Sequence, residues 1–244
     1  MEKEFRIGDK VNGYLVKRVV NLPEIKNILI ELVHQKSGAR HIHLKNEDTN
    51  NVFGVALKTI PEDSTGVAHI LEHAALSGSK KYPVRDLFTA MIKRSVNTYM
   101  NAFTSSDWTM YPFGSQNEID YYNLLGVYLD AVFYPNLSEF DFMQEGHRLE
   151  FKEGDNVDGP LEIKGIVYNE MKGAMSSPSS VASQKNLEAL FPTTTYRFNS
   201  GGEPVDIPNL TYDEFKMFHQ RFYHPSNSYF YTYGSPPMSG NIAV

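Results

Sequence analysis

The segment His69-Ile70-Leu71-Glu72-His73 contains the residues whose types and spacing are best suited to chemistry. In a helix the two imidazoles lie about 40° apart around the axis, with Glu72 beside them. Neutral imidazoles one turn apart can occupy neighbouring corners of a zinc tetrahedron, and an adjacent carboxylate can deprotonate a metal-bound water. The order H-x-x-E-H is the inverse of the zinc peptidase motif H-E-x-x-H. The segment therefore predicts a zinc site with Glu72 as general base; the alternative is a chance cluster on a solvated helix face.

A third ligand is expected from Glu170, in a segment, 161–175, that we predict to be helical. On a helical wheel Glu170 falls within a stripe of apolar residues: Ile163, Ile166, Val167 and Ala174. A carboxylate buried there needs compensation for its charge, and a metal ion would supply it. The alternative is a Glu170 that reaches solvent or pairs with a lysine. Three other carboxylates would replace it if the helix register differed: Glu150, Glu153 and Glu162.

Four other histidines are candidate functional groups: His41, His43, His147 and His224. His41 and His43 lie two positions apart on one face of a predicted strand and could bind a metal, but we interpret them as an exposed pair on a sheet. His147 and His224 lie near predicted helix ends, where a capping role is expected instead of catalysis. The sequence contains no cysteine, so any metal site must use His, Asp and Glu.

Hydrophobic periodicity predicts the elements that must position these residues. The expected strands are 14–16, 28–33, 41–44, 52–57, 97–104, 107–113 and 229–233. The expected helices are one capped at 63–65 that runs to Ser77, then 84–93, 119–132, 138–146, 161–175, 179–190 and 212–222. Thr211 and Glu214 form a capping box before the last helix. The fold class is therefore α+β, a mostly antiparallel sheet of about five to six strands with helices packed on one face.

Composition limits the classes of partner. The 244 residues carry a net charge of -6 and no run of basic residues, so nucleic acid is not an expected partner. The sequence shows neither the roughly 18 apolar residues of a membrane span nor a secretory signal, so no membrane partner is expected. The lack of cysteine fits a reducing compartment, and we predict a cytoplasmic location, or an organelle matrix for a eukaryotic source. Residues 1–234 are expected to form a single domain, and the linker-like composition of 235–244 predicts a truncation point.

Several segments together resemble the pitrilysin or insulinase family of inverted-zincin metallopeptidases, and its presequence-protease branch in particular. These segments are 63–73, 100–112, 168–173, 200–204 and 224–227. The likeness runs from residue 13 to residue 234 and corresponds to the first, N-terminal domain of that branch only. The resemblance implies the fold of a pitrilysin-like or mitochondrial-processing-peptidase-like metallohydrolase domain.

By this resemblance the zinc ligands would be His69, His73 and Glu170, and Glu72 would be the general base. The long separation between His73 and Glu170 is typical of the presequence-protease branch. Three positions depart from a common family pattern without touching these residues: Ala68, Ser77 and Leu87. The larger departure is length, because family members have further domains, and a Tyr and an Arg from their second half complete the substrate site.

The resemblance also implies a peptide-binding edge strand around 99–104. An extended peptide would add to it as a further strand, a mode of binding that selects little among side chains. The substrate-binding residues would be Asn101, Ala102, Phe103 and Thr104. For Asn101 and Thr104 the alternative is ordinary turn and strand chemistry.

Two functions follow from these observations. The first is a zinc-dependent endopeptidase domain that hydrolyses short unstructured peptides, with little or no activity without the missing C-terminal part. The second is a zinc-binding interaction or structural module, or a truncated non-catalytic paralogue that needs a partner half. The expected partners are a peptide substrate and the remaining domains of the full-length enzyme or a partner half. The exposed inter-domain face could also mediate a homo-oligomer.

Overall fold

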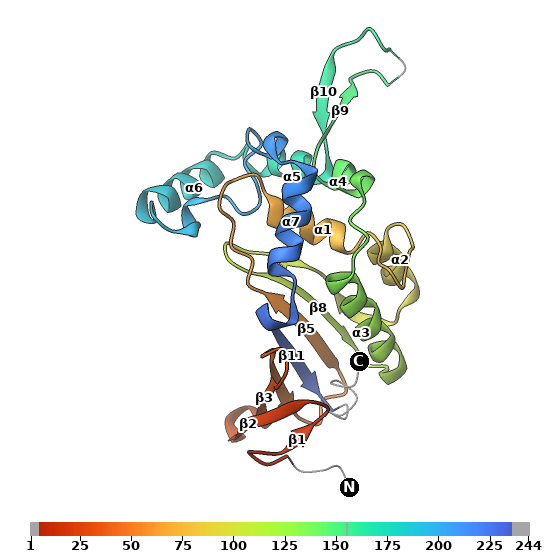
Figure 1. Cartoon of the computed structure of the whole chain (residues 1–244), viewed down its shortest axis with the longest axis vertical. Helices are drawn as coiled ribbons and strands as arrows, with labels where there is room; N and C mark the ends of the chain where they lie inside the picture. The colour runs from red at the N-terminus through yellow and green to blue at the C-terminus, as the bar shows by residue number, and fades with distance from the viewer. Residues whose placement is uncertain (1–4, 155, 236–244) are drawn as a thin grey trace.

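The computed structural model describes residues 5–154 and 156–235, and one large sheet dominates it (Figure 1). In these residues the sheet has nine strands in the order β1-β2-β3-β4-β11-β5-β8-β6, with β7 also paired to β8. The strands are β1 (Lys10–Val11), β2 (Tyr14–Leu22), β3 (Asn27–His34), β4 (Arg40–Lys45), β5 (Asn51–Leu57), β6 (Asn97–Met100), β7 (Phe103–Thr104), β8 (Thr109–Ser115) and β11 (Ser228–Gly234). Neighbours are antiparallel except β11 and β4, which run parallel. Of the predicted tail at 235–244, all but Ser235 lies outside the described residues.

The helices follow the predicted order along the chain. They are α1 (Val67–Ala75), α2 (Leu87–Arg94), α3 (Glu118–Phe133), α4 (Glu139–Glu145), α5 (Ile166–Ala174), α6 (Pro178–Leu190) and α7 (Tyr212–Phe222). The predicted capping box of Thr211 and Glu214 is confirmed at the start of α7. Figure 1 shows α6 standing away from the main body of the domain. None of the helices in the described part of the chain is long and apolar enough to span a bilayer.

The α+β class is confirmed, but the sheet has more strands than the five or six expected. The additional strands are short. β1 pairs with β2 through a tight turn in which Asn12 and Gly13 adopt positive φ angles of 45° and 82°. The predicted strand 97–104 is divided into β6 and β7 at Asn101 and Ala102, where the regular register with β8 is interrupted.

The predicted helix 161–175 is wrong over its first residues. They form β10 (Leu161–Lys164), which pairs with β9 (Arg148–Phe151) in a separate hairpin that projects from the body (Figure 1). A Cβ on Gly165 would collide with the carbonyl oxygen of Gly146, so only glycine fits where the hairpin closes. The helix therefore starts at Ile166. A helical wheel contains no information about this cross-strand pairing, which explains the error.

The core that carries the candidate site lies between the central strands and α1. Phe53 of β5 and Phe113 of β8 are buried and their ring centroids lie 5.4 Å apart. Ile70 and Leu71 of α1 are fully buried in the same apolar cluster. Each such side chain contributes about 1.5 to 3 kcal/mol when removed from water. This burial fixes the rotation of α1 about its axis, and thereby the direction in which its polar side chains point.

Candidate metal centre

His69 and His73 lie one turn apart on the same side of α1, as the H-x-x-E-H spacing predicts. Their ring centroids are 5.0 Å apart and the ring planes are inclined by 76°. The other side of the helix is buried in the core through apolar residues: Val67, Ile70, Leu71 and Ala74. The imidazoles themselves keep 12% and 26% of their side-chain surface exposed. The core thus holds the helix while both rings remain within reach of an ion.

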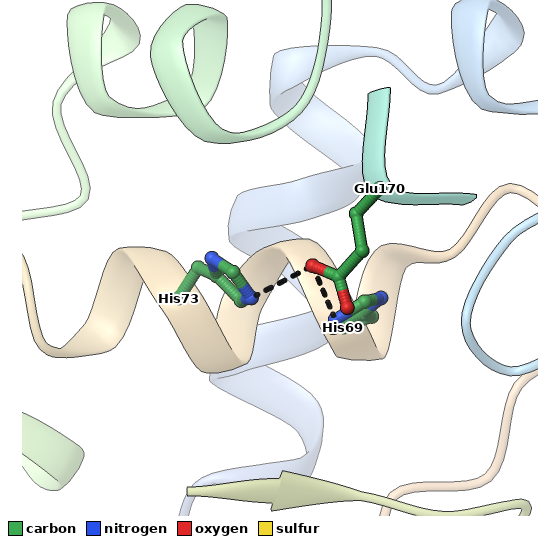
Figure 2. A group of neighbouring side chains, drawn as sticks. All are labelled: His69, His73 and Glu170. Atoms are coloured by element: carbon green, nitrogen blue, oxygen red, sulfur yellow. Dashed lines mark ion pairs between the residues drawn. The ribbon is translucent and has the colours of Figure 1, made fainter. Parts of the chain in front are cut away.

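Glu170 reaches the two imidazoles from α5 (Figure 2). Its Oε2 atom lies 3.8 Å from Nε2 of His69 and 3.8 Å from Nε2 of His73. One ligand atom from each of the three residues lies within 4.8 Å of the others. Ligand atoms bound at about 2.1 Å to a tetrahedral zinc ion are about 3.4 Å apart, so small side-chain movements would fit these three to one ion. The donor set of two nitrogens and one carboxylate also suits zinc.

The expected burial of Glu170 is wrong, although its position beside the imidazoles agrees with the prediction. Its side chain is 54% exposed. The buried residues of α5 are Val167 and Met171, and Ile163 belongs to a strand. The helical wheel therefore included one residue, Ile163, that is not helical, and it predicted burial for a stripe of which Val167 alone is buried. The substitute ligands are elsewhere: Glu150 and Glu162 pair with Lys164 in the projecting hairpin, where Glu153 also lies.

Both imidazoles are oriented by a hydrogen bond at Nδ1. The Nδ1 atom of His69 donates to the backbone carbonyl oxygen of Gly201 at 3.0 Å. The Nδ1 atom of His73 lies 3.2 Å from Oε2 of Glu145, a residue only 6% exposed. Because a carbonyl and an ionised carboxylate accept hydrogen bonds, the proton of each neutral ring resides on Nδ1. Each Nε2 lone pair then points towards Glu170, which is the arrangement that metal-binding histidines require.

Sequence reasoning missed Glu145 and Gly201. Both are distant from α1 in sequence, and neither belongs to the motif. A signal for Glu145 was present in the predicted helix 138–146, where a carboxylate follows Phe142 near the buried end. No comparable local signal marks the carbonyl of Gly201, since any residue has one.

Three carboxylates surround His73 and favour a positive charge at the site. Burial, the largest single influence, lowers the pKa of His73. The hydrogen bond to Glu145 and the charges of Glu72, Glu145 and Glu170 outweigh burial, so the pKa of His73 is raised overall. The same carboxylates would attract a metal cation. Both the charges and the positions of these side chains therefore suit a bound metal cation.

Glu72 lies beside the cluster and is held by a hydrogen bond. It is 9% exposed, and the hydroxyl of Thr104 donates to its Oε2 atom at 2.6 Å. Two buried tyrosines lie near Glu72: Tyr111 and Tyr223, whose hydroxyls are 2.8 Å apart. The charge of Glu72 influences the pKa of both phenols. Burial is the largest cause that raises the pKa of both phenols, and the charge of Glu72 is a smaller one, so they remain neutral. Glu72 is therefore a fixed carboxylate with one hydrogen-bonded oxygen.

The residues predicted to bind substrate lie next to this carboxylate, at an edge of the sheet. β6 and β7 pair with β8 on one side, and among the described residues no strand pairs with their other side. Asn101 donates its backbone N–H to the carbonyl of Pro112, and Phe103 is 41% exposed. A cavity of about 350 Å³ adjoins them, lined among others by Glu72, His73, Asn101 and Ala102. An extended peptide placed along this edge would pass the three clustered side chains.

The other histidines have structural partners. The interpretation of His41 and His43 as an exposed pair is wrong, because both are 1% exposed. Their ring nitrogens contact the same hydroxyl, that of Thr232 on β11, at 2.8 and 2.9 Å. The error arises because β11 inserts between β4 and β5, a long-range pairing that places Thr232 and Phe230 beside the histidines. His224 caps the short 3-10 helix that follows it, and His147 contacts the carbonyl of Leu210.

A contact between glycines brings the Gly201 carbonyl to His69. Gly66 precedes α1 with a φ angle of 72°, a conformation that favours glycine. A Cβ at this position would lie 2.8 Å from the carbonyl oxygen of Gly201 and 2.8 Å from Cα of Gly202. The start of α1 and the 199–202 loop can therefore approach closely only because these residues lack side chains.

Replacing Gly66 with alanine is expected to lower the free energy of unfolding by about 2 kcal/mol, because the Cβ adds both a collision and a strained φ angle. Urea denaturation followed by circular dichroism measures this change. Gly173→Ala is the matched control, since Gly173 lies in α5 and a Cβ there meets nothing within 4 Å. Equal stability of the two variants would contradict the role given to the glycine contact.

The nine-stranded sheet and the helix-borne H-x-x-E-H segment together define a pitrilysin-like α+β domain. The fold matches the crystal structure of pitrilysin with a TM-score of 0.72 and 17% sequence identity, covering 95% of this chain and 24% of that one. Residues 60–157 match the sequence model of the insulinase family, peptidase family M16. Residues 60–157 are therefore similar to the insulinase family, as the resemblance of the motifs indicated, and the fold is similar to that of pitrilysin.

Two mitochondrial presequence proteases are similar over nearly the whole chain. Identity to the Xenopus tropicalis protein is 52% over 231 residues, which is 95% of this chain and 22% of the relative. Identity to the Mus musculus protein is 48% over 239 residues, which is 98% of this chain and 23% of the relative. The chain thus spans less than a quarter of the length of these relatives.

Proposed function

We propose that this chain forms the metal-binding and proton-transferring part of a zinc-dependent endopeptidase. One observation carries the proposal: Nε2 of His69, Nε2 of His73 and a carboxylate oxygen of Glu170 converge within 4.8 Å, with Glu72 alongside. The similarity to proteins named presequence protease supports the same reaction class.

In this proposal His69, His73 and Glu170 hold the ion, and the hydrogen bonds at Nδ1 fix the two imidazoles in place. Zinc, when bound, supplies Lewis acidity and lowers the pKa of a bound water. Glu72 accepts a proton from the attacking water and later returns it to the leaving amine. The hydrogen bond from Thr104 keeps one oxygen of Glu72 occupied and leaves the other for this proton transfer.

The proposed substrates are short, unstructured peptides that add to the open edge formed by β6 and β7. Asn101, Ala102, Phe103 and Thr104 lie along this edge, and backbone pairing there would place a peptide bond near Glu72. Segments of mitochondrial targeting sequences are one such class, as the names of the relatives suggest. Those names also favour an organelle matrix over the cytoplasmic location expected from composition.

We further propose that the single domain of residues 1–234 works with additional domains or a partner half. The relatives are more than four times as long as the stretch that this chain matches. Glu170 is 54% exposed, so water has free access to the site from this side. An open site excludes water poorly and provides few donors for a developing oxyanion, so slow hydrolysis by the isolated chain is expected. The same exposure favours a second candidate function, a zinc-binding module without turnover. If a second copy of the chain covered this exposed face, the result would be a homo-oligomer.

The metal centre is tested by replacing Glu170 with glutamine. Structural zinc sites are worth about 10 to 16 kcal/mol over four ligands, so loss of one anionic ligand is expected to weaken zinc about a hundredfold. Competition against a chromogenic chelator measures the affinity. Glu162→Gln is the control, because Glu162 was a substitute ligand by sequence and lies in the hairpin. Equal affinities for the two variants would refute Glu170 as a ligand.

Activity separates the two candidate functions. With the remaining domains present, the peptidase hypothesis expects cleavage of a fluorescence-quenched peptide that stops when a chelator removes zinc. Tight zinc binding without cleavage, even with those domains supplied, would favour the non-catalytic module.

A further inference from the structure

A series of hydrogen bonds links His73 of α1 to Arg85 through the side chains of Glu145 and Gln144. The Nδ1 atom of His73 lies 3.2 Å from Oε2 of Glu145. The side-chain amide of Gln144 donates from Nε2 to the other oxygen of Glu145 at 2.9 Å. Arg85 in turn donates from its guanidinium to Oε1 of Gln144 at 2.8 Å. Both oxygens of the buried Glu145 carboxylate are therefore occupied by groups from two different directions.

Arg85 determines the orientation of the Gln144 amide, and the Glu145 carboxylate, which can only accept, determines the tautomer of His73. A guanidinium can only donate, so the oxygen of the Gln144 amide must face it. The amide nitrogen of Gln144 then faces Glu145 and donates to it. The carboxylate of Glu145 accepts this hydrogen bond and, at its second oxygen, one from His73. The proton of the neutral His73 ring is thereby held on Nδ1, and the lone pair of Nε2 is directed to Glu170.

We propose that Arg85, Gln144 and Glu145 are positioning residues that fix the tautomer of His73 and so keep its Nε2 atom available as a metal ligand. The inference rests on the proposed metal centre and names what organises one of its ligands. His69 provides an internal comparison, because its Nδ1 donates to the backbone carbonyl of Gly201 and depends on no side chain. Substitutions of Arg85, Gln144 or Glu145 should therefore act on His73 and leave the tautomer of His69 unchanged.

Replacing Glu145 with glutamine is expected to move the ring proton of His73 from Nδ1 to Nε2. With Arg85 and Gln144 unchanged, the Gln144 amide nitrogen still donates towards position 145, so the new amide turns its oxygen to Gln144 and its nitrogen to His73. A nitrogen that donates to Nδ1 forces the ring proton onto Nε2, which removes the metal-binding lone pair. Second-shell changes of this kind typically cost about 10-fold to 100-fold in metal affinity.

The experiment measures histidine tautomers and zinc affinity in the same variants. Long-range proton-nitrogen NMR spectra of the metal-free 244-residue chain at pH 8.5 distinguish the Nδ1–H and Nε2–H forms of each ring. In Glu145→Gln the His73 signals are expected to change to the Nε2–H pattern while those of His69 do not, and zinc affinity is expected to fall about 10-fold to 100-fold. Glu139→Gln, at an exposed position of the same helix, is the control and should change neither.

A second substitution separates positioning from a general effect on folding. In the double variant Q144L/E145Q nothing forces the orientation of the amide at position 145, so it can turn its oxygen to His73. Partial recovery of the Nδ1–H pattern and of zinc affinity, relative to Glu145→Gln alone, supports the proposal. An unchanged His73 tautomer in Glu145→Gln, or an equal change at His69, would overturn it. A wild-type chain with the Nδ1–H pattern but no affinity for zinc would instead contradict the metal centre and leave the hydrogen-bonded chain intact.

Discussion

Replacing Glu72 with glutamine is expected to lower kcat for peptide hydrolysis about a thousandfold, because an amide cannot accept the proton that general base catalysis transfers. Zinc affinity should stay within about twofold of wild type, since Glu72 is outside the group of three converging ligand atoms. Glutamine has the shape of glutamate, and its carbonyl oxygen can still accept the hydrogen bond that Thr104 donates. The variant therefore removes the base and preserves its surroundings.

The assay requires the chain together with the additional domains proposed for it. Hydrolysis of a quenched peptide gives kcat and KM, and chelator competition gives zinc affinity. Glu62→Gln is a suitable control, because Glu62 is an exposed carboxylate near α1 that pairs with Arg221. Undiminished turnover in Glu72→Gln would exclude Glu72 as the base. Loss of zinc together with turnover would assign it to the ligand set instead.

The local part of this site could be predicted because its determinants are contiguous. The helix α1, its buried side and the placement of His69 and His73 on one face all follow from a few consecutive residues. The capping box at Thr211 is similarly local. In these stretches hydrophobic period, capping and motif spacing favour one structure, and tertiary contacts reinforce it.

The remainder depended on contacts between distant segments. Glu170 was selected for a burial that it does not have, because the pairing of β9 with β10 changes where α5 begins. The partners of the two imidazoles at Nδ1, Gly201 and Glu145, come from segments far along the chain. No periodicity within a single segment carries information about these contacts. The motif therefore predicts the positions of the two candidate histidine ligands, but not the groups that orient them.

The burial of the two histidines of β4, which the sequence did not predict, has a consequence for acid stability. His41 is packed between Tyr14 and Phe230 and contacts Thr232, the residue of β11 that lies opposite His43. Burial, and secondarily the charge of His43, lowers the pKa of His41 to about 3. In the unfolded chain an imidazole has a pKa of about 6.5. Between these two values the unfolded chain binds a proton at His41 that the folded chain excludes.

The free energy of unfolding should therefore be fully retained above pH 6.5 and fall as the pH decreases towards 3. A difference of one proton corresponds to about 1.4 kcal/mol per pH unit, so His41 alone accounts for a loss of about 4 kcal/mol across this range. Urea denaturation at a series of pH values between 6.5 and 4 measures the slope. In His41→Gln, whose amide can still contact the Thr232 hydroxyl, the slope is expected to be smaller by about 1.4 kcal/mol per unit.

His224→Gln is the control, since it replaces an exposed imidazole and leaves the buried His41 in place. The comparison is between slopes and not between stabilities at one pH, because removing a buried ring from the sheet also costs packing energy at every pH. Carboxylates that titrate in the same range contribute equally to all three proteins and cancel in the difference. Identical slopes in wild type and His41→Gln would mean that the folded sheet accepts the proton, and that burial does not keep His41 neutral.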